Sequence, residues 1–167
     1  MKKFLFIVLA LICISPSFMD AAPDSKADAA PEPKAEKHSA FFNKLTDTNK
    51  GFAVEADYIE WYFGEQANIE AEIDNDCLME DDKCIAPDGY YIRNTDQKSL
   101  TLPIAKDATV IMQTYQIEKT NEIQWDQEVT LEEFIKEFES SERLQYVPYH
   151  IEVQDGAITK ITEQYVP

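Results

Sequence analysis

Short apolar stretches, most of them alternating with polar residues and bounded by turn residues, dominate this chain. They cover residues 52–63, 90–93, 100–104, 110–115 and 149–161. Alternation with a period of two is typical of half-buried β-strands. In the first stretch the parity of the apolar positions flips near the middle, which predicts a bulge or a bend there. The pattern therefore favours a domain built mainly on a sheet.

Helices are expected in only two places. Thr130 and Glu133 have the spacing of a capping box. Four large apolar residues then follow at the i, i+3, i+4 and i+7 positions, and they are Leu131, Phe134, Ile135 and Phe138. This spacing predicts a helix over 130–138 with one buried face. Residues 64–74 match the strand and helix periods equally well, and their Ala and Glu content favours a short helix.

The last segment of the chain predicts a β-hairpin, because Asp155-Gly156 is a strong hairpin turn signal between two alternating stretches. Pro103 predicts that the strand over 100–104 lies at an edge or beside a bulge. Short strands with a capped helix before the last hairpin indicate the α+β class. The expected architecture is an antiparallel sheet or a small OB-like β-barrel with one or two short helices.

The first residues have the organisation of a signal peptide. Two lysines precede the apolar run 4–14, and a proline follows it. A helix that spans a bilayer needs about 20 apolar residues, so this run is too short. We expect residues 1–17 to be a signal peptide that is cleaved after Ser17, with cleavage near Ala21 or Ala29 as alternatives. No transmembrane helix is expected in the exported part.

An alternative interpretation of the same segment is a lipid anchor on Cys13. Lipidation sites normally have a small residue before the cysteine, whereas Ile12 precedes this one, so removal of Cys13 with the signal peptide is favoured. Residues 18–40 are rich in Ala, Pro, Asp, Glu and Lys, which predicts a disordered linker. Residues 41–167 are then expected to form a single folded α+β domain.

The chain is strongly acidic. Its 15 Lys and Arg residues stand against 32 Asp and Glu residues, and two of the lysines belong to the predicted signal peptide, so the remainder has a formal net charge of −19. Because phosphate backbones require a basic surface, nucleic acid is excluded as a partner. The sequence also lacks the GxGxxG and P-loop motifs that bind nucleotides. The acidic residues favour solubility outside the cell, or attraction to Ca²⁺ or to a basic protein.

Two cysteines remain after the predicted cleavage. Cys77 and Cys84 are separated by six residues, and in an exported chain such a pair predicts a structural disulfide. The chain-entropy relation gives about 2.5 kcal/mol of stabilisation for so small a ring. A zinc site and free thiols are the alternatives.

The best metal candidate is an acidic segment that contains Asp74, Asp76 and the run 80–82. Hard cations such as Ca²⁺ bind several oxygen atoms at short range. When Asp74 is taken as position 1 of an EF-hand loop, Met79 replaces the turn glycine and Ile85 replaces the bidentate glutamate. No metal ligand is therefore assigned. A weak Ca²⁺ site stays open as an alternative to a solvated acidic loop.

No catalytic residue is assigned. His38 lies in the predicted linker, so a catalytic Ser-His-Asp or Cys-His arrangement must use His150 as its base. The GxSxG motif is absent, and Ser140 and Ser141 follow the predicted helix, where serines are common. A small hydrolase would require His150 to lie within hydrogen-bond distance of both a nucleophile and a carboxylate. A surface histidine is favoured instead.

Aromatic residues offer the remaining candidate site. If several were exposed together they could form a binding platform, although most are expected to lie in the core. The candidates are Trp61, Tyr62, Phe63, Tyr90, Tyr91, Tyr115, Tyr146, Tyr149 and Tyr165.

Three segments have a recognisable order along the chain. They are FGEQA at 63–67, YYIRN at 90–94 and EQYVP at 163–167. These segments and their order resemble an uncharacterised group of small secreted or surface proteins of Gram-positive bacteria, in which GEEA, YYIRN and a terminal EQYLP occur in that order. The resemblance extends over 51–167 and implies a bacterial origin and a helix over 64–74. It carries over no catalytic or binding residue.

These features together predict an exported, non-enzymatic module that binds a protein or a cell-envelope component and uses no cofactor. The alternatives are a weak Ca²⁺-binding structural protein and a small extracellular hydrolase.

Overall fold

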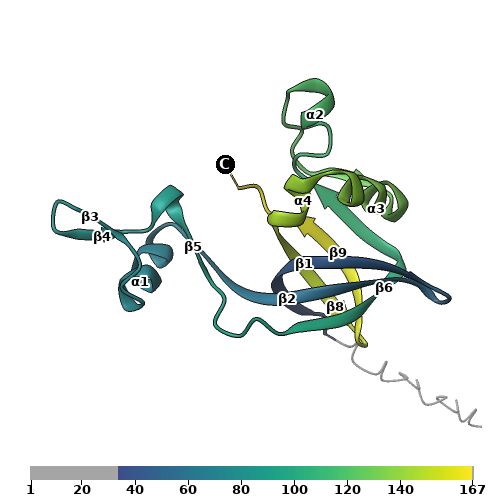
Figure 1. The fold of residues 1–167 in the computed structure, drawn as a ribbon, viewed down its shortest axis with the longest axis horizontal. Coiled ribbons are helices and arrows are strands. Elements are labelled where there is room, and N and C mark those ends of the chain that lie inside the picture. The colour runs from purple at the N-terminus through teal and green to yellow at the C-terminus, as the bar shows by residue number, and fades with distance from the viewer. Residues whose placement is uncertain (1–33, 167) are drawn as a thin grey trace, which may run out of the picture. The chain divides into compact units, whose positions relative to one another are not determined.

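Five strands form the centre of the computed structural model, which describes residues 34–166. These strands are β1 (Glu36–Thr48), β2 (Gly51–Phe63), β6 (Ser99–Met112), β8 (Pro148–Gln154) and β9 (Ala157–Glu163). They hydrogen-bond in the order β2-β1-β8-β9-β6, and β6 pairs with β2 as well. The second pairing closes the sheet into a five-stranded barrel (Figure 1).

The connectivity of the barrel is that of an OB-like fold. The strands β1, β2 and β6 form an antiparallel meander, and β8 and β9 form a hairpin. The pairing of β6 with β9 is parallel. The connection from the third barrel strand to the fourth includes the helices α3 (Leu131–Ser140) and α4 (Glu142–Tyr146). This arrangement confirms the predicted fold class and selects the small OB-like barrel over an open sheet.

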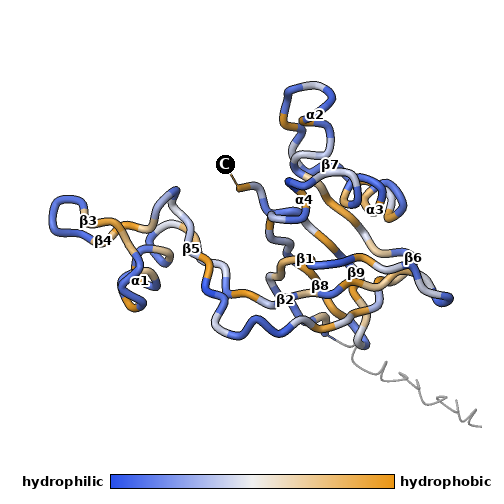
Figure 2. Tube along the Cα trace, viewed as in Figure 1, coloured by the Kyte–Doolittle hydropathy of each residue, from blue (hydrophilic) through white to orange (hydrophobic). Residues whose placement is uncertain are grey.

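The core lies between the inward-facing side chains of the barrel and the apolar face of α3. The ring of Phe42 stacks on that of Tyr149 with the centroids 4.4 Å apart, and the ring of Phe134 from α3 packs edge-on against both. The capping box begins α3 as predicted, because the Thr130 hydroxyl accepts from the Glu133 amide and the Glu133 carboxylate accepts from the Thr130 amide. Figure 2 shows the apolar stretches of the barrel strands in orange.

A separate set of elements is inserted between β2 and β6. It contains α1 (Glu65–Ile73), β3 (Leu78–Glu80), β4 (Lys83–Ile85), the 3₁₀ turn η1 (Pro87–Gly89) and β5 (Tyr90–Arg93). The helix predicted over 64–74 is α1. The cysteines 77 and 84, with Cα atoms 5.5 Å apart, form a disulfide that clips the β3–β4 hairpin. We refer to residues 64–89 as the disulfide lobe.

The remaining elements are α2 (Ile117–Thr120) and β7 (Gln127–Val129), and β7 pairs with the end of β6. No helix within residues 34–166 has the length and apolar character needed to cross a membrane.

Two strand predictions differ from the structure. The strands predicted over 100–104 and 110–115 are parts of one strand, β6, whose register with β9 is interrupted between Ile104 and Thr109. The parity flip in β2 marks a change of partner, because β2 pairs with β6 as far as Asp57 and with β5 from Glu60 onward. The register shift itself lies in β1, at Asn43.

The predicted start of the folded part is also corrected. The structure places β1 from Glu36, within the predicted linker 18–40. Polar residues hide the start of this strand in the sequence, since residues 36–39 are polar and the first buried apolar positions are Ala40 and Phe42. The predicted signal peptide 1–17 and the first part of that linker lie outside the described residues.

Candidate functional site

Two rows of mainly polar residues cross β1, β8 and β9 on the outer face of the barrel. Strand register places the residues of each row directly opposite one another. Inward-facing neighbours such as Tyr149 and Ile151 fill the core, so the alternation of each strand points these polar residues outward. The first row is Ser39, His150 and Thr162, and the second is Lys37, Glu152 and Lys160.

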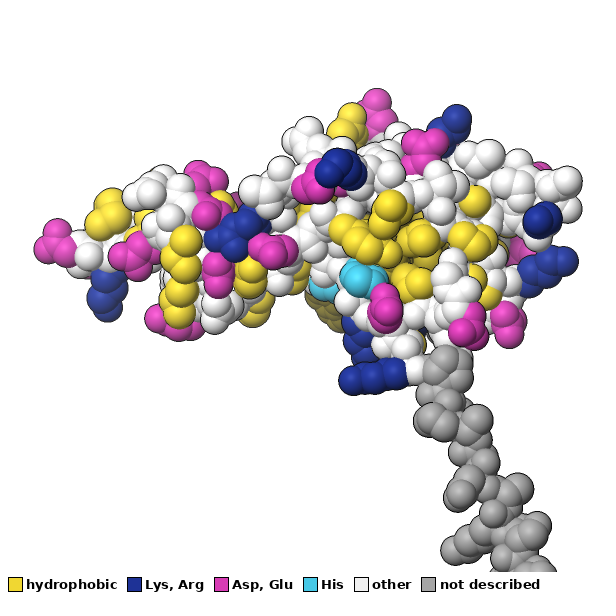
Figure 3. Space-filling view, turned by 90° about the horizontal axis from the view of Figure 1, so that it is seen from below, with side chains coloured by type: hydrophobic (Ala, Val, Ile, Leu, Met, Phe, Trp, Pro, Cys, Tyr) yellow, Lys and Arg dark blue, Asp and Glu magenta, His cyan; other side chains and the backbone are white. Residues whose placement is uncertain are grey.

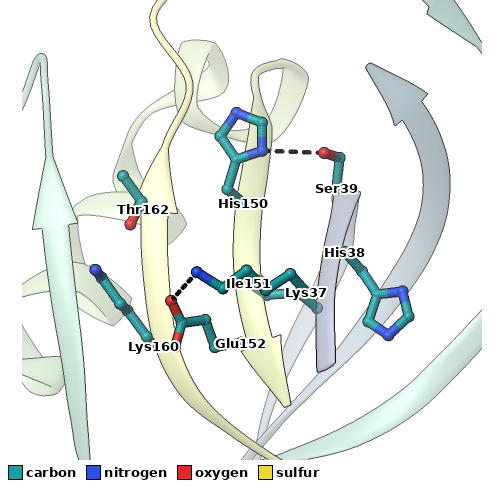
Figure 4. A pocket seen from close by; sticks show the side chains of 8 residues that line it. All are labelled: Lys37, His38, Ser39, His150, Ile151, Glu152, Lys160 and Thr162. Carbon is teal, nitrogen blue, oxygen red and sulfur yellow. Dashed lines mark hydrogen bonds and ion pairs between the residues drawn. The ribbon is translucent and has the colours of Figure 1, made fainter. Parts of the chain in front are cut away.

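Two adjoining hollows lie over this face. The first has a volume of about 290 Å³ and is lined by both rows (Figure 4). The second has a volume of about 320 Å³, and its lining includes Trp125 and Tyr165. His150 and Thr162 line both hollows. Because ligand pockets commonly measure about 300–1,000 Å³, a ligand of ordinary size would extend over both hollows and cross His150.

Hydrogen bonds on both ring nitrogens hold His150 in place. Its Nε2 lies 2.8 Å from Oε1 of Gln164, and its Nδ1 lies 3.0 Å from the hydroxyl of Ser39. The Gln164 amide nitrogen donates to the carbonyl of Tyr165, so its oxygen is the atom that faces the histidine. An amide oxygen only accepts, hence Nε2 carries a proton, and in the neutral ring Nδ1 accepts from Ser39.

Two aromatic pairs border the same histidine. The Trp61 ring packs edge-on against the imidazole with centroids 6.3 Å apart, and it stacks on Tyr90 at 4.8 Å. Trp125 and Tyr165 pack edge-to-face at 5.2 Å and line the second hollow. The Trp125 side chain is 57% exposed, which leaves its ring face open to a ligand.

The first hollow contains more basic than acidic side chains. Lys37 reaches across β8 to the Glu152 carboxylate at 3.2 Å (Figure 4). Lys160 lines the same hollow, and within residues 34–166 it has no ion-pair partner. Figure 3 shows the histidine side chains beside a group of hydrophobic side chains, with Lys or Arg side chains nearby. This excess of positive charge is confined to the first hollow, because the described residues that line the second include Asp126 and Glu163 and no Lys or Arg. It is opposite in sign to the formal net charge of −17 of the whole chain.

A buried carboxylate supports the floor of the second hollow. Glu163, at the end of β9, is only 2% exposed. It accepts hydrogen bonds from the backbone amides of Gln113 and Thr114 at 2.8 and 3.0 Å, from the Thr114 hydroxyl, and from Arg143 at 3.1 Å. These bonds join the ends of β6 and β9 to α4 and so fix the backbone around Gln164.

A hydrolase would require His150 to lie within hydrogen-bond distance of both a nucleophile and a carboxylate, and the structure meets only the first requirement. His150 has a hydroxyl within hydrogen-bond distance, from Ser39, but its second partner is the neutral amide of Gln164 and not a carboxylate. An amide cannot balance the positive charge that a general base gains. Ser141 lies elsewhere, with its hydroxyl bonded to Glu118.

The nine aromatic candidates do not form one platform. Tyr149 lies in the core, Phe63 and Tyr146 are exposed, and Tyr115 packs against the edge of the core. Tyr62 and Tyr91 pack against the disulfide lobe. Of the other three candidates, Tyr165 lines the second hollow, and Trp61, which stacks on Tyr90, packs edge-on against His150.

The acidic segment is organised around Arg93, a residue that sequence reasoning did not single out. Its guanidinium contacts Asp74 at 2.6 Å, Glu70 at 3.0 Å and Glu60 at 3.1 Å. The hydrogen bond from Arg93, and then that from Tyr91, lowers the pKa of Asp74. Asp74 is thus engaged in an ion pair, and within residues 34–166 no group of three or more His, Cys, Asp or Glu side chains converges as a metal site would require.

Comparisons with protein-family models, with curated proteins and with solved structures gave no match.

Sequence reasoning missed most of the hollow. Lys37 and Ser39 lie in the predicted linker, and Thr162, Gln164 and Trp125 belong to no motif. An available signal was the pair of apolar residues Ala40 and Phe42, two positions apart and flanked by Ser39 and Asn43, which would have indicated β1 and its outward face.

Proposed function

We propose that this chain is an exported, non-enzymatic binding module and that the two hollows around His150 form its ligand site. The observation that carries the proposal is that a fixed imidazole and two aromatic pairs meet on one face of the barrel, beside a first hollow in which Lys37 and Lys160 outnumber the single acid. The Cys77–Cys84 disulfide supports the extracytoplasmic location, because such bonds persist in oxidising compartments.

The lining favours a ligand that carries both hydroxyl groups and negative charge. Ser39 and Thr162 offer hydrogen-bonding groups, while Trp125 offers an exposed ring against which the C–H groups of a polyol or sugar can pack. Lys160 supplies a positive charge without an acidic partner in the described residues. An anionic polyol or glycan of the cell envelope combines these properties.

Isothermal titration of the oxidised chain with a glycerol phosphate oligomer, and with neutral maltohexaose as the comparison, tests this proposal. We expect the anionic oligomer to bind and the neutral sugar to bind more weakly. Lys160→Met should weaken binding of the anionic oligomer at least about tenfold. Lys136→Met, which changes an exposed lysine on α3, is the matched control. Equal binding by Lys160→Met and the unmodified chain would contradict the proposal.

A small hydrolase is the second candidate, favoured by the hydrogen bond between Ser39 and His150. A stopped-flow assay with p-nitrophenyl acetate separates it from a binding module. We expect no burst of nitrophenolate above that of Ser39→Ala. A burst that disappears in both Ser39→Ala and His150→Gln would show acyl transfer and overturn the non-enzymatic proposal.

A further inference from the structure

The disulfide lobe exposes an unusual amount of apolar surface. Five of the eight large hydrophobic residues that are exposed in the described part of the chain lie between positions 63 and 79. Within the lobe these are Ile69 at 42% exposed, Ile73 at 64%, Leu78 at 57% and Met79 at 68%. Exposed apolar side chains are common singly, but a concentration of them indicates an interaction surface.

One of these side chains, Ile69, lines a groove, and two others lie on the same faces as its walls. Ile69 on α1 and Ile85 on β4 both line a groove of about 460 Å³. Ile73 follows Ile69 by one helical turn, so it continues the same face of α1. Leu78 is the register partner of Ile85 in the hairpin and therefore lies on the same face of that hairpin. The groove thus has apolar residues on both of its sides.

The rim of the groove is acidic. Glu65, Glu72 and Asp82 line it together with a single lysine, Lys83. The whole lobe, residues 64–89, contains nine Asp and Glu residues and one Lys. Figure 2 shows the hydrophilic tip of the hairpin in blue next to apolar stretches in orange. The ion pairs of Arg93 involve only Glu70 and Asp74 of these acids.

The lobe is held in shape without a large core. Its buried residues are three alanines, at positions 67, 71 and 86, which pack with Tyr62, Cys77 and Tyr91. The disulfide clips the hairpin, and Asn68 on α1 accepts a hydrogen bond from the Ala86 amide at 2.8 Å. Because the small alanines already fill the contact between α1 and the hairpin, the larger apolar residues of the lobe face outward.

We infer that the groove of the disulfide lobe docks a basic, amphipathic segment of a partner polypeptide. An amphipathic helix lays its apolar face into such a groove, and basic residues at its margins would meet Glu65, Glu72 and Asp82. Charge argues against a second copy of the lobe as occupant, since two surfaces with nine acids each repel one another. This docking site is distinct from the hollows around His150 and does not depend on them.

The test uses a fluorescent peptide of about 18 residues in which Leu and Lys form opposite faces of a helix. A Leu/Glu peptide of the same pattern and a Ser/Lys peptide of the same charge are the comparisons. Anisotropy titrations with the oxidised chain should show binding of the Leu/Lys peptide that weakens with added salt. Ile73→Ser and Leu78→Ser should each weaken it at least about tenfold. Leu100→Ser, which removes an exposed apolar side chain outside the lobe, should not change it.

Three results would overturn the inference. The first is equal binding of the Leu/Lys and Ser/Lys peptides, which would show attraction to net charge alone. The second is unchanged binding by Ile73→Ser and Leu78→Ser when circular dichroism shows both variants folded. The third is a dimer in sedimentation velocity that Ile73→Ser dissociates, because the groove would then be occupied by a second copy. Substitutions around His150 should leave peptide binding unchanged, so failure here is distinguishable from failure of the proposed function.

Discussion

Replacement of Glu163 by glutamine tests the reasoning about the support beneath the hollows. The carboxylate is 2% exposed, and its oxygens accept from two backbone amides, one hydroxyl and one guanidinium. Glutamine has the same shape but only one accepting oxygen. In its best orientation the glutamine oxygen still accepts hydrogen bonds from the backbone amides of Gln113 and Thr114. The Thr114 hydroxyl rotates so that it accepts a hydrogen bond from the NH₂ group of the glutamine. Arg143 then loses its charged acceptor.

The loss of the ion pair with Arg143 sets the expected decrease in the free energy of unfolding. A hydrogen bond to a charged group contributes about 1.5–3 kcal/mol, and breaking a buried ion pair costs about 3–5 kcal/mol. Because the Arg143 side chain is 35% exposed, water partly replaces the lost partner, and we expect Glu163→Gln to lower the free energy of unfolding by about 3 kcal/mol. For a domain of this size the thermal midpoint should fall by about 10 °C.

Urea titration followed by far-ultraviolet circular dichroism measures this change. Glu152→Gln is the matched control, since its carboxylate pairs at the surface with Lys37 and should cost less than about 1 kcal/mol. A double-mutant cycle of Glu163→Gln with Arg143→Met should give a coupling energy of about 1–3 kcal/mol. A loss below about 1 kcal/mol for Glu163→Gln at an unchanged urea m-value, or a coupling near zero, would refute the assignment.

Three further predictions concern the core, the Arg93 cluster and the disulfide. Phe134→Ala should lower the free energy of unfolding by about 3–5 kcal/mol in the same titration, and a loss below about 1 kcal/mol would contradict its core position. The hydrogen bond from Arg93 lowers the pKa of Asp74, so their ion pair stabilises the fold above the ordinary carboxyl range and is lost as the pH falls below it. The thermal midpoints of Arg93→Met and the unmodified chain should therefore differ at pH 7 and converge as the pH falls below that range, and a constant difference would refute this. Reduction of Cys77–Cys84 should cost about 2.5 kcal/mol and speed hydrogen exchange within the lobe, whereas faster exchange throughout the barrel would show that the bond supports the whole domain.

Local signals account for most of the elements that could be predicted. The capping box at Thr130 and the turn at Asp155-Gly156 depend on residues within a few positions of one another, and both are present in the structure. The β3–β4 hairpin and α2 were missed because their short segments carry no clear period. Residues 36–40 were interpreted as linker, and the first part of strand β1 was lost with them, because four of these five residues are polar.

The sequence by itself determined most of the barrel strands, the capped helix, the cysteine pairing and the acidic charge, because each depends on nearby residues or on composition alone. Only the tertiary structure decided that the sheet closes into a barrel and that Ser39 meets His150, which lies 111 positions further along the chain. Outward positions on paired strands become neighbours through the register between strands, and the burial of inward side chains such as Phe42 and Tyr149 sets that register. The ligand face is therefore a consequence of how the core packs, and no single segment of the chain contains it.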